Sequence, residues 1–509
     1  MYTHKGRWEI VTYAKLLEQT NRFARGLQAC SLTPGMRAAI LTPPNIEFFP
    51  FAFALLKLGI VPVIVDPAIG LKKLGVCINE SKPDIFFGNT LTHTLRKIFG
   101  WGKETIKHNL TLEKVKGQTS KVVQSPISNL QSLAPDSLAA IIFTSGSTGI
   151  PKGVSYSQEN FSAQLDLLQE TFNISEDEID LPAFPLYAII DALLGVTSVI
   201  PDVTFPVPGN TDPKKVFYAI EKFKVTNMFA SPVVLDILAN FHINSQQRAA
   251  GLQSLKRVIT AGAPATIPLQ EKFRRILDDH TDLFGIYGAT ESLPIAKVES
   301  REIFALKEKT AHGAGICLGK PIDGVKVRVI QISDEPIEGW QESLVVQPNV
   351  VGEITVQSAA TTRTYLHRQD ANRSSKIKHG EEVIHRMGDV GYFDEAGRLW
   401  YCGRKSQRVK TQDGIFFTEQ IEGIFNVHPA VHRTALVGVH HEPILWVQLN
   451  PGVSNQDTIK QELIELGKPH RQAAQIKTFL FMKQFPTDVR HNSKIIREEL
   501  TLLAKKRLS

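Results

Sequence analysis

The sequence predicts a two-domain protein, with a large N-terminal α/β domain followed by a small C-terminal α+β domain. Its 509 residues exceed what one compact core usually holds. Through roughly the first four hundred residues, amphipathic helical stretches alternate with short apolar runs, as where RAAILTP follows TYAKLLEQTNRFARGL. Such alternation is typical of a parallel sheet covered by helices. A compact mixed segment begins near Arg404, so we expect the domain boundary between Gly403 and Arg408.

The stretch Phe143–Val154, FTSGSTGIPKGV, is predicted to be a tight loop between two strands. The apolar run LAAIIF suits a buried strand, GVSYS a second one, and Ser157 the N-cap of a following helix. A loop so rich in glycine turns several N–H groups to one side and forms an anion-binding concavity, to which Lys152 adds a charge. This favours a polyphosphate ligand. Since Lys152 lies between Pro151 and Gly153, the loop is not a Walker A motif; an ordinary turn is the alternative.

Several features point to a soluble protein of the cytoplasm. The opening MYTHKGRWEI has no apolar core of a signal peptide. Prolines, a glycine and Lys57 interrupt Phe48–Val65, the most membrane-like stretch, so we expect a buried helix followed by a strand rather than a transmembrane segment. The four cysteines lie far apart without a CxxC pair, which fits a reducing compartment and argues against structural zinc.

The net charge of +7 is concentrated near the C-terminus, where residues 404–509 include 16 basic and 10 acidic side chains. A nucleic-acid-binding protein would show a dense basic stripe with aromatic residues between the charges. The basic residues here are dispersed, so we expect no nucleic acid partner. A basic cap for a small polyanion remains an alternative to a plain solvated surface.

Two short motifs have the composition of nucleotide contacts. TAGAP (Thr260–Pro264) follows a strand-like run, and its small residues would let a flat group lie against the backbone; a plain turn is the alternative. GIYGATES (Gly285–Ser292) places the hydroxyl of Thr290 beside the carboxylate of Glu291. Magnesium bound to phosphates takes one or two protein carboxylates, so Glu291 is a candidate ligand, with an unpaired turn residue as the alternative.

A third motif, MGDVGYFDEAGRLWYCGR (Met387–Arg404), brings together a carboxylate and a guanidinium. Asp389 could accept hydrogen bonds from both hydroxyls of a ribose, and Arg404 could donate two fixed ones. The alternative is a surface hairpin with DEAG as its turn.

Taken in order, TSGSTGIPKG, GAP, YGATE, GD, GR and a near-terminal lysine resemble the superfamily of adenylate-forming enzymes, which includes acyl-CoA synthetases, peptide-synthetase adenylation domains and luciferases. The resemblance covers nearly the whole chain. It implies an N-terminal AMP-binding domain over residues 1–403, a hinge over 404–408 and a mobile lid domain over 409–509. It also implies ATP and Mg²⁺.

The resemblance further implies a role for each site residue. The phosphate-binding residues would be Thr144, Ser145, Gly146, Ser147, Thr148, Gly149 and Lys152. The adenine would lie along Gly262, Ala263 and Pro264, with further nucleotide contacts from Tyr287, Gly288 and Tyr401. Thr290 would meet the α-phosphate, and Glu291 with Thr144 would bind Mg²⁺. Asp389 and Arg404 would hold the ribose, and Lys494 would be the catalytic lysine.

Four positions depart from the common pattern of the superfamily. They are Ala188 in place of a histidine, Gly285 in place of an asparagine, Ser406 in place of the hinge aspartate and Ser493 in place of the glycine before the catalytic lysine. The β-lactone synthetases of the long-chain olefin pathway look similar in these features, in YGATESLP and in FPTDVRHNSKI. That resemblance implies a thiolase, a reductase and a decarboxylase as pathway partners.

Two half-reactions follow from this resemblance. A long-chain β-hydroxy fatty acid would attack the α-phosphate of ATP and release pyrophosphate, and its own β-hydroxyl would then close a β-lactone and release AMP. Tyr187 and Asp191 are candidates for the acyl site, with Asp191 as the base; an N-cap is the alternative for Asp191.

Two other functions stay open. A fatty acyl-CoA ligase would use coenzyme A as acceptor. A non-catalytic ATP-binding subunit of an assembly would have lost Lys494, Glu291 or Lys152, and all three are present.

Overall fold

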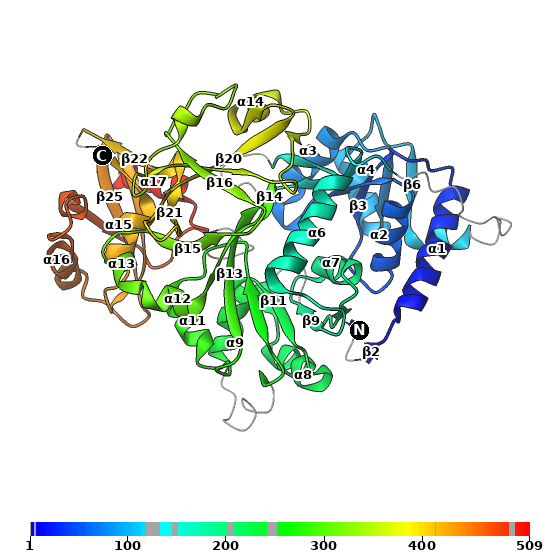
Figure 1. The fold of residues 1–509 in the computed structure, drawn as a ribbon, viewed down its shortest axis with the longest axis horizontal. Coiled ribbons are helices and arrows are strands. Elements are labelled where there is room, and N and C mark those ends of the chain that lie inside the picture. The colour runs from blue at the N-terminus through cyan, green and yellow to red at the C-terminus, as the bar shows by residue number, and fades with distance from the viewer. Residues whose placement is uncertain are drawn as a thin grey trace.

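The computed structural model describes residues 2–4, 7–118, 133–144, 151–201, 208–241, 252–412, 414–487 and 494–508. Within these ranges the chain forms two large sheets and a smaller C-terminal sheet, which lie next to one another across the molecule (Figure 1). A short antiparallel pair, β1 (Tyr2–His4) and β2 (Arg7–Glu9), precedes them.

The first large sheet is built from the N-terminal third of the chain and one later strand, β18. Its strands, in sheet order, are β18 (Thr364–Tyr365), β8 (Gly153–Ser157), β7 (Leu138–Phe143), β4 (Val61–Ile64), β3 (Arg37–Leu41), β5 (Ile85–Gly88) and β6 (His108–Leu110). The strands from β7 to β6 run parallel, while β8 and β18 are antiparallel additions. The helices of this part are α1 (Tyr13–Ala29), α2 (Phe48–Lys57), α3 (Leu71–Ser81), α4 (Thr90–Phe99), α5 (Leu112–Gly117) and α6 (Gln158–Phe172).

Two sequence predictions in this region are confirmed. The apolar stretch from residue 48 to 65 forms α2 and then β4, as expected of a buried helix and strand. Ser157 caps α6: its hydroxyl accepts a hydrogen bond from the Asn160 N–H, and the Asn160 side chain accepts one from the Ser157 N–H. Among the described residues, none of the helices combines the length and apolar character that a membrane crossing requires.

The second large sheet is mixed. In sheet order its strands are β10 (Thr197–Ser198), β9 (Ile179–Pro182), β11 (Asn227–Ala230), β12 (Arg257–Thr260), β13 (Asp282–Ala289), β14 (Ser292–Glu299), β15 (Ile316–Pro321), β21 (Leu399–Arg404), β20 (Glu382–Phe393), β17 (Gly352–Gln357) and β16 (Lys326–Ile330), with β19 (Lys376–His379) beside β20. Its parallel part, from β10 to β13, continues into an antiparallel part. The helices are α7 (Ala188–Leu193), α8 (Pro213–Phe223), α9 (Pro232–Asn240), α11 (Ile267–Arg274), α12 (Ser300–Ala305), α13 (Lys307–Ala311) and α14 (Gln369–Ser375).

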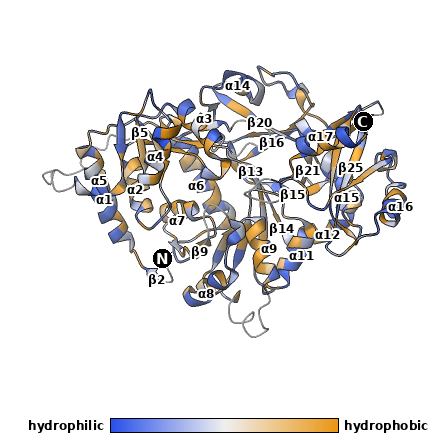
Figure 2. Ribbon diagram, turned by 180° about the vertical axis from the view of Figure 1, so that it is seen from behind, coloured by the Kyte–Doolittle hydropathy of each residue, from blue (hydrophilic) through white to orange (hydrophobic). Residues whose placement is uncertain are grey.

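The last hundred residues form a compact α+β unit. Its elements are β22 (Val409–Thr411), β23 (Gly414–Phe416), α15 (Thr418–Phe425), β24 (Val431–Val439), β25 (Glu442–Leu449), α16 (Gln456–Gly467), β26 (Thr478–Phe481) and α17 (Arg497–Leu508). The indole of Trp446, fully buried on β25, donates to the Leu500 carbonyl and ties α17 to the sheet. Figure 2 shows hydrophobic residues along β25 and hydrophilic ones on the outer helix α16, the pattern of a separate core.

Candidate active site

The strands β7 and β8 hold the two ends of the predicted phosphate loop together. The Thr144 N–H donates to the Lys152 carbonyl at 3.0 Å, and the Lys152 N–H donates to Thr144 Oγ1 at 3.3 Å. Thr144 and Lys152 therefore face each other at the base of the loop. The loop residues between them, Ser145, Gly146, Ser147, Thr148 and Gly149, lie outside the described residues.

Tyr365 connects this loop to Glu291. It lies on β18, opposite Val154 of β8, and the Lys152 ammonium is 4.8 Å from the centre of its ring. The Tyr365 hydroxyl donates to Glu291 Oε1 at 2.5 Å. Lys152 and Glu291, which were predicted from separate motifs, thus both contact Tyr365. The sequence analysis missed Tyr365, because its strand has only two residues and its partner is 74 positions away.

The backbone of Thr290 and Glu291 is anchored on both sides. The Glu291 carbonyl accepts from the Thr362 N–H at 2.9 Å and from Thr362 Oγ1 at 3.1 Å. The Thr290 carbonyl accepts from the Tyr156 hydroxyl. Of the two carboxylate oxygens of Glu291, Oε1 accepts the hydrogen bond from Tyr365, and Oε2 accepts none from the described residues. The motif therefore presents one oxygen of Glu291 from a fixed backbone.

A buried lysine that the sequence analysis also missed stands behind this anchor. Lys376, at the start of β19, donates to the Thr362 carbonyl, and its ammonium is 5.4 Å from the centre of the Tyr365 ring. Burial lowers the pKa of Lys376 to about 7, against the opposing effect of the Glu291 carboxylate. His385 pairs with Lys376 across β19 and β20, and burial with that positive charge lowers its pKa. In the sequence, nothing distinguishes Lys376 from a lysine on the surface.

Asp389 and Arg404 face each other on neighbouring strands. Asp389 of β20 is paired with Arg404 of β21, and Arg404 Nη1 lies 2.9 Å from Asp389 Oδ1. The Tyr287 hydroxyl donates to Asp389 Oδ2 at 2.6 Å. The hairpin of the alternative interpretation does form here. Asp389 is nevertheless buried in it, so the part of that alternative that made Asp389 a surface charge is wrong.

The electrostatics of Asp389 link it to three more predicted residues. Burial raises its pKa, while Arg404 and Lys494 lower it and Glu291 raises it. Asp389 also raises the pKa of Tyr401. Asp389 Oδ1 is buried and has no hydrogen-bond partner among the described residues, although Arg404 lies within ion-pair distance. A buried carboxylate oxygen without a donor fits a ligand that supplies one, such as a ribose hydroxyl.

The residues predicted to line the adenine follow β12. Gly262, Ala263 and Pro264 begin two residues after the strand ends, and Gly262 has a φ of 93°, which a residue with a side chain rarely adopts. Thr260 at the end of β12 is paired with Gly285 of β13. In the same strand β13, a Cβ added to Gly288 would meet Leu293 Cδ1 at 2.4 Å, so this position has no room for a side chain.

The two acyl-site candidates make different contacts. The Tyr187 ring packs against the Phe229 ring of β11, tilted by 31° with centroids 4.1 Å apart. Asp191 instead lies inside α7, where its Oδ2 accepts from the Ser198 hydroxyl at 2.6 Å and its carboxyl shares a hydrogen bond with Asp180. The N-cap alternative for Asp191 is wrong, because the helix begins three residues earlier. A buried carboxyl pair favours a structural role over that of a base.

We expect Asp191→Asn to flatten the pH dependence of stability. Burial raises the pKa of Asp191 to about 7, whereas an unfolded aspartate titrates near about 3.9. Between these values the folded state binds more protons than the unfolded one, so stability falls as pH rises and levels off above about 7. Asparagine keeps the hydrogen bonds without titrating, so melting temperatures at pH 5 to 8 should fall less steeply than in the wild type.

The exposed Asp177 provides the matched control. Asp177→Asn should keep the wild-type slope between pH 5 and 8. The same slope in Asp191→Asn would show that the Asp180–Asp191 pair is ionised throughout this range.

A comparison with protein families identifies the chain. The family described as "AMP-binding enzyme" matches residues 1–366. The chain belongs to this family. Curated relatives of this AMP-binding enzyme include olefin beta-lactone synthetases from Xanthomonas campestris pv. campestris, 40% identical, and Stenotrophomonas maltophilia, 38% identical; each alignment covers 97% of this chain and 91% of the relative. The protein is therefore an adenylate-forming ligase.

Solved structures show the same fold at low sequence identity. O-succinylbenzoate coenzyme A synthetase from Bacillus subtilis, in complex with AMP, superposes with a TM-score of 0.76 at 21% identity, over 97% of this chain and 94% of that one. MatB from Rhodopseudomonas palustris, with ATP bound, superposes with a TM-score of 0.80 at 19% identity, over 98% and 95%. The adenylate-forming fold, a large α/β domain followed by a smaller C-terminal one, is thereby confirmed for this AMP-binding enzyme.

Two sets of ion pairs flank the predicted hinge of this AMP-binding enzyme. Ser406 lies in a short 3-10 helix, Lys405–Gln407. Before it, the Lys405 ammonium lies 3.0 Å from the buried Glu353 carboxylate. After it, Arg408 Nη2 lies 2.6 Å and the Lys410 ammonium 3.0 Å from Asp334 Oδ2. The residues around Ser406 are thus held to the larger part of the chain on both sides; Ser493, the other departure near Lys494, lies outside the described residues.

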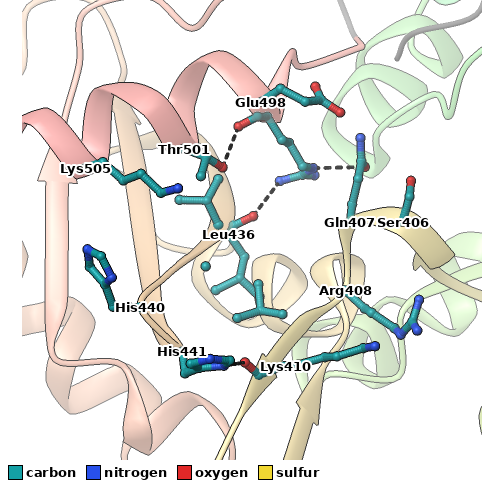
Figure 3. A pocket seen from close by; sticks show the side chains of 14 residues that line it. Ser406, Gln407, Arg408, Lys410, Leu436, His440, His441, Glu498, Thr501 and Lys505 are labelled. Carbon is teal, nitrogen blue, oxygen red and sulfur yellow. Dashed lines mark hydrogen bonds between the residues drawn. The ribbon is translucent and has the colours of Figure 1, made fainter. Parts of the chain in front are cut away.

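A cavity of about 440 Å³ lies beside Ser406 (Figure 3). The hinge residues form one wall, and α17 with the turn after β24 forms the other. His440 and His441, the two residues of that turn, both have positive φ angles, of 51° and 65°. Of the predicted nucleotide-binding residues that the structure describes, none lines this cavity. Tyr287 and Arg404 contact Asp389 instead, and Lys152 and Glu291 contact Tyr365.

Proposed function

We propose that the protein activates a long-chain β-hydroxy fatty acid with ATP and closes the acyl-adenylate to a β-lactone. The observation that carries this proposal is the 40% identity to an olefin beta-lactone synthetase over almost the whole of both chains. The residues Ala188 and Ser406 support it, since they replace the histidine and the hinge aspartate that are common in the thioester-forming members of the superfamily.

In the first half-reaction, a carboxylate oxygen of the acid attacks the α-phosphorus of ATP, and the bond from that phosphorus to pyrophosphate breaks. In this proposal the Lys494 ammonium would lie between the attacking carboxylate and the α-phosphate. Its positive charge lowers the pKa of Asp389, the proposed ribose ligand. Asp389 and Arg404 would hold the ribose, and Thr290 the α-phosphate. Such positioning and charge stabilisation supply most of the catalysis in phosphoryl chemistry.

The residues present fit a magnesium ion held mainly by phosphates. Glu291 offers one carboxylate oxygen, while its other oxygen accepts from the tyrosine whose ring faces Lys152. The described residues contain no cluster of three or more metal-binding side chains. Magnesium characteristically takes one or two carboxylates and completes its shell with phosphate oxygens and water. When bound, it would offset the charge of the leaving pyrophosphate.

In the second half-reaction, the β-hydroxyl oxygen would attack the acyl carbon, and the bond from that carbon to the phosphate oxygen of AMP would break. The hydroxyl proton would pass to water or to the departing AMP. The hydroxyl needs no second binding event, and effective molarities for well-oriented internal attack reach about 10⁵–10⁸ M. Rotation of the C-terminal part about Ser406 would switch the enzyme from the conformation for the first half-reaction to that for the second.

We also propose that the enzyme works in the cytoplasm, beside a thiolase, a reductase and a decarboxylase.

The product made from a β-hydroxy acid tests the proposal. With ATP, Mg²⁺ and a long-chain β-hydroxy acid, we expect AMP, pyrophosphate and a product one water lighter than the acid, without any thiol. Mass spectrometry of the organic extract measures it. The matched acid without the β-hydroxyl should be adenylated and then stall. Turnover that requires coenzyme A and gives a thioester from plain fatty acids would make the protein an acyl-CoA ligase instead.

A further inference from the structure

Tyr365 bridges the two large sheets at the edge of the proposed site. Its strand β18 extends the first sheet, whereas Glu291 lies in the turn between β13 and β14 of the second. The Tyr365 side chain is buried, and its hydroxyl is 2.5 Å from Glu291 Oε1. This hydrogen bond therefore fixes the direction of a carboxylate that comes from a different layer of the fold.

The surroundings of Tyr365 restrict its ring. The Lys152 ammonium is 4.8 Å from the ring centre and that of Lys376 is 5.4 Å away, both within the range of a cation–π contact. Lys376 also donates to the Thr362 carbonyl, and Thr362 donates twice to the Glu291 carbonyl. Lys376 thus contacts the Tyr365 ring directly and holds the Glu291 backbone through Thr362.

We propose that Tyr365 is a positioning residue for Glu291, one that holds Oε1 so that Oε2 faces a divalent cation bound with ATP. The inference rests on the metal-binding role proposed for Glu291. A ligating carboxylate is oriented by the hydrogen bond that its other oxygen accepts, and loss of such a partner typically lowers metal affinity about 10–100-fold. Tyr365 would therefore act on the cation through Glu291 without touching the substrate.

The variant Tyr365→Phe tests this directly. It removes one oxygen atom and keeps the ring against Lys152, so the fold and its melting temperature should change little. We expect the Mg²⁺ concentration for half-maximal ATP–pyrophosphate exchange to rise about 10–100-fold, with most of the rate restored at saturating Mg²⁺. A role confined to packing would lower the melting temperature and the maximal rate, and would leave the Mg²⁺ requirement unchanged.

Direct binding gives a readout independent of turnover. Mn²⁺, which shares the preference for oxygen ligands, can be titrated against the protein with a non-hydrolysable ATP analogue, and free Mn²⁺ followed by electron paramagnetic resonance. Tyr365→Phe should weaken this binding by the same factor. The matched control is Tyr392→Phe, which removes the hydroxyl of a partly buried tyrosine that donates to the Ala314 carbonyl at 3.1 Å; it should bind Mn²⁺ like the wild type.

The variant Glu291→Gln distinguishes the metal-binding role of Glu291 from the positioning role of Tyr365. If Glu291→Gln weakens Mn²⁺ binding and Tyr365→Phe does not, the role of Tyr365 is disproved while that of Glu291 stands. If neither variant changes binding, the proposed metal role of Glu291 fails, and the inference about Tyr365 fails with it. If both weaken binding, the double variant should be no weaker than Glu291→Gln alone, because both changes act on one carboxylate.

Discussion

Lys494→Ala is expected to reduce substrate-dependent ATP–pyrophosphate exchange by about 10²–10³, the usual cost of losing one preorganised group that stabilises developing charge. Lys494 lies next to an isolated bridge between Thr487 and Ile495, and its charge lowers the pKa of Asp389. The two charges therefore interact, which is consistent with the catalytic role proposed for Lys494. Since the lysine would act on the transition state, we expect the loss in kcat rather than in the KM for ATP.

The control for this variant is a lysine of the same C-terminal unit. Lys468 is exposed and forms an ion pair with Glu465 at 2.5 Å. Lys468→Ala should retain wild-type exchange, and circular dichroism should show the same fold for both variants. Wild-type exchange in Lys494→Ala would remove Lys494 from the reaction.

Glu353→Gln is expected to destabilise the larger part of the protein by about 3–5 kcal/mol, the cost of leaving a buried charge without its partner. Glu353 is almost completely buried and contacts Arg386 Nη2 at 2.6 Å and the Lys405 ammonium at 3.0 Å. The amide cannot compensate two cations, and Arg386 is buried as well. Urea unfolding followed by tryptophan fluorescence measures the change.

An exposed ion pair provides the comparison. Glu338 lies 3.1 Å from Arg373, and both side chains are largely in solvent. Glu338→Gln should cost about 0–1 kcal/mol, as surface pairs usually do. Equal losses in the two variants would show that water reaches the Glu353 cluster and that its burial contributes little.

Local signals were enough to predict part of this structure. The strands β7 and β8 and the cap at Ser157 follow from the run of apolar residues and from one hydroxyl next to a helix start. The pairing of Asp389 with Arg404 follows from a short hairpin, in which the register is set by the turn between the strands. In each case the interacting groups are close in the sequence.

The remaining contacts join elements that only the tertiary fold brings together. Tyr365 lies 74 positions from Glu291, and the bond between them depends on two sheets meeting. Lys376 gives no local sign of being buried, because a lysine at the start of a strand is most often exposed. The pairing of Asp180 with Asp191 likewise depends on α7 packing against β9 and β10.

The two ion-pair sets around Ser406 differ in how far they are open to water, and dissolved salt acts on them unequally. Asp334 is about half exposed, whereas Glu353 is buried. The Debye length shortens from about 30 Å at 0.01 M ionic strength to about 3 Å at 1 M, and exposed pairs are screened far more than buried ones. Rising ionic strength would therefore weaken the contact after the hinge and leave the one before it in place. Salt would thus loosen the chain at Asp334, after Ser406, while Lys405 stays fixed to Glu353 before it.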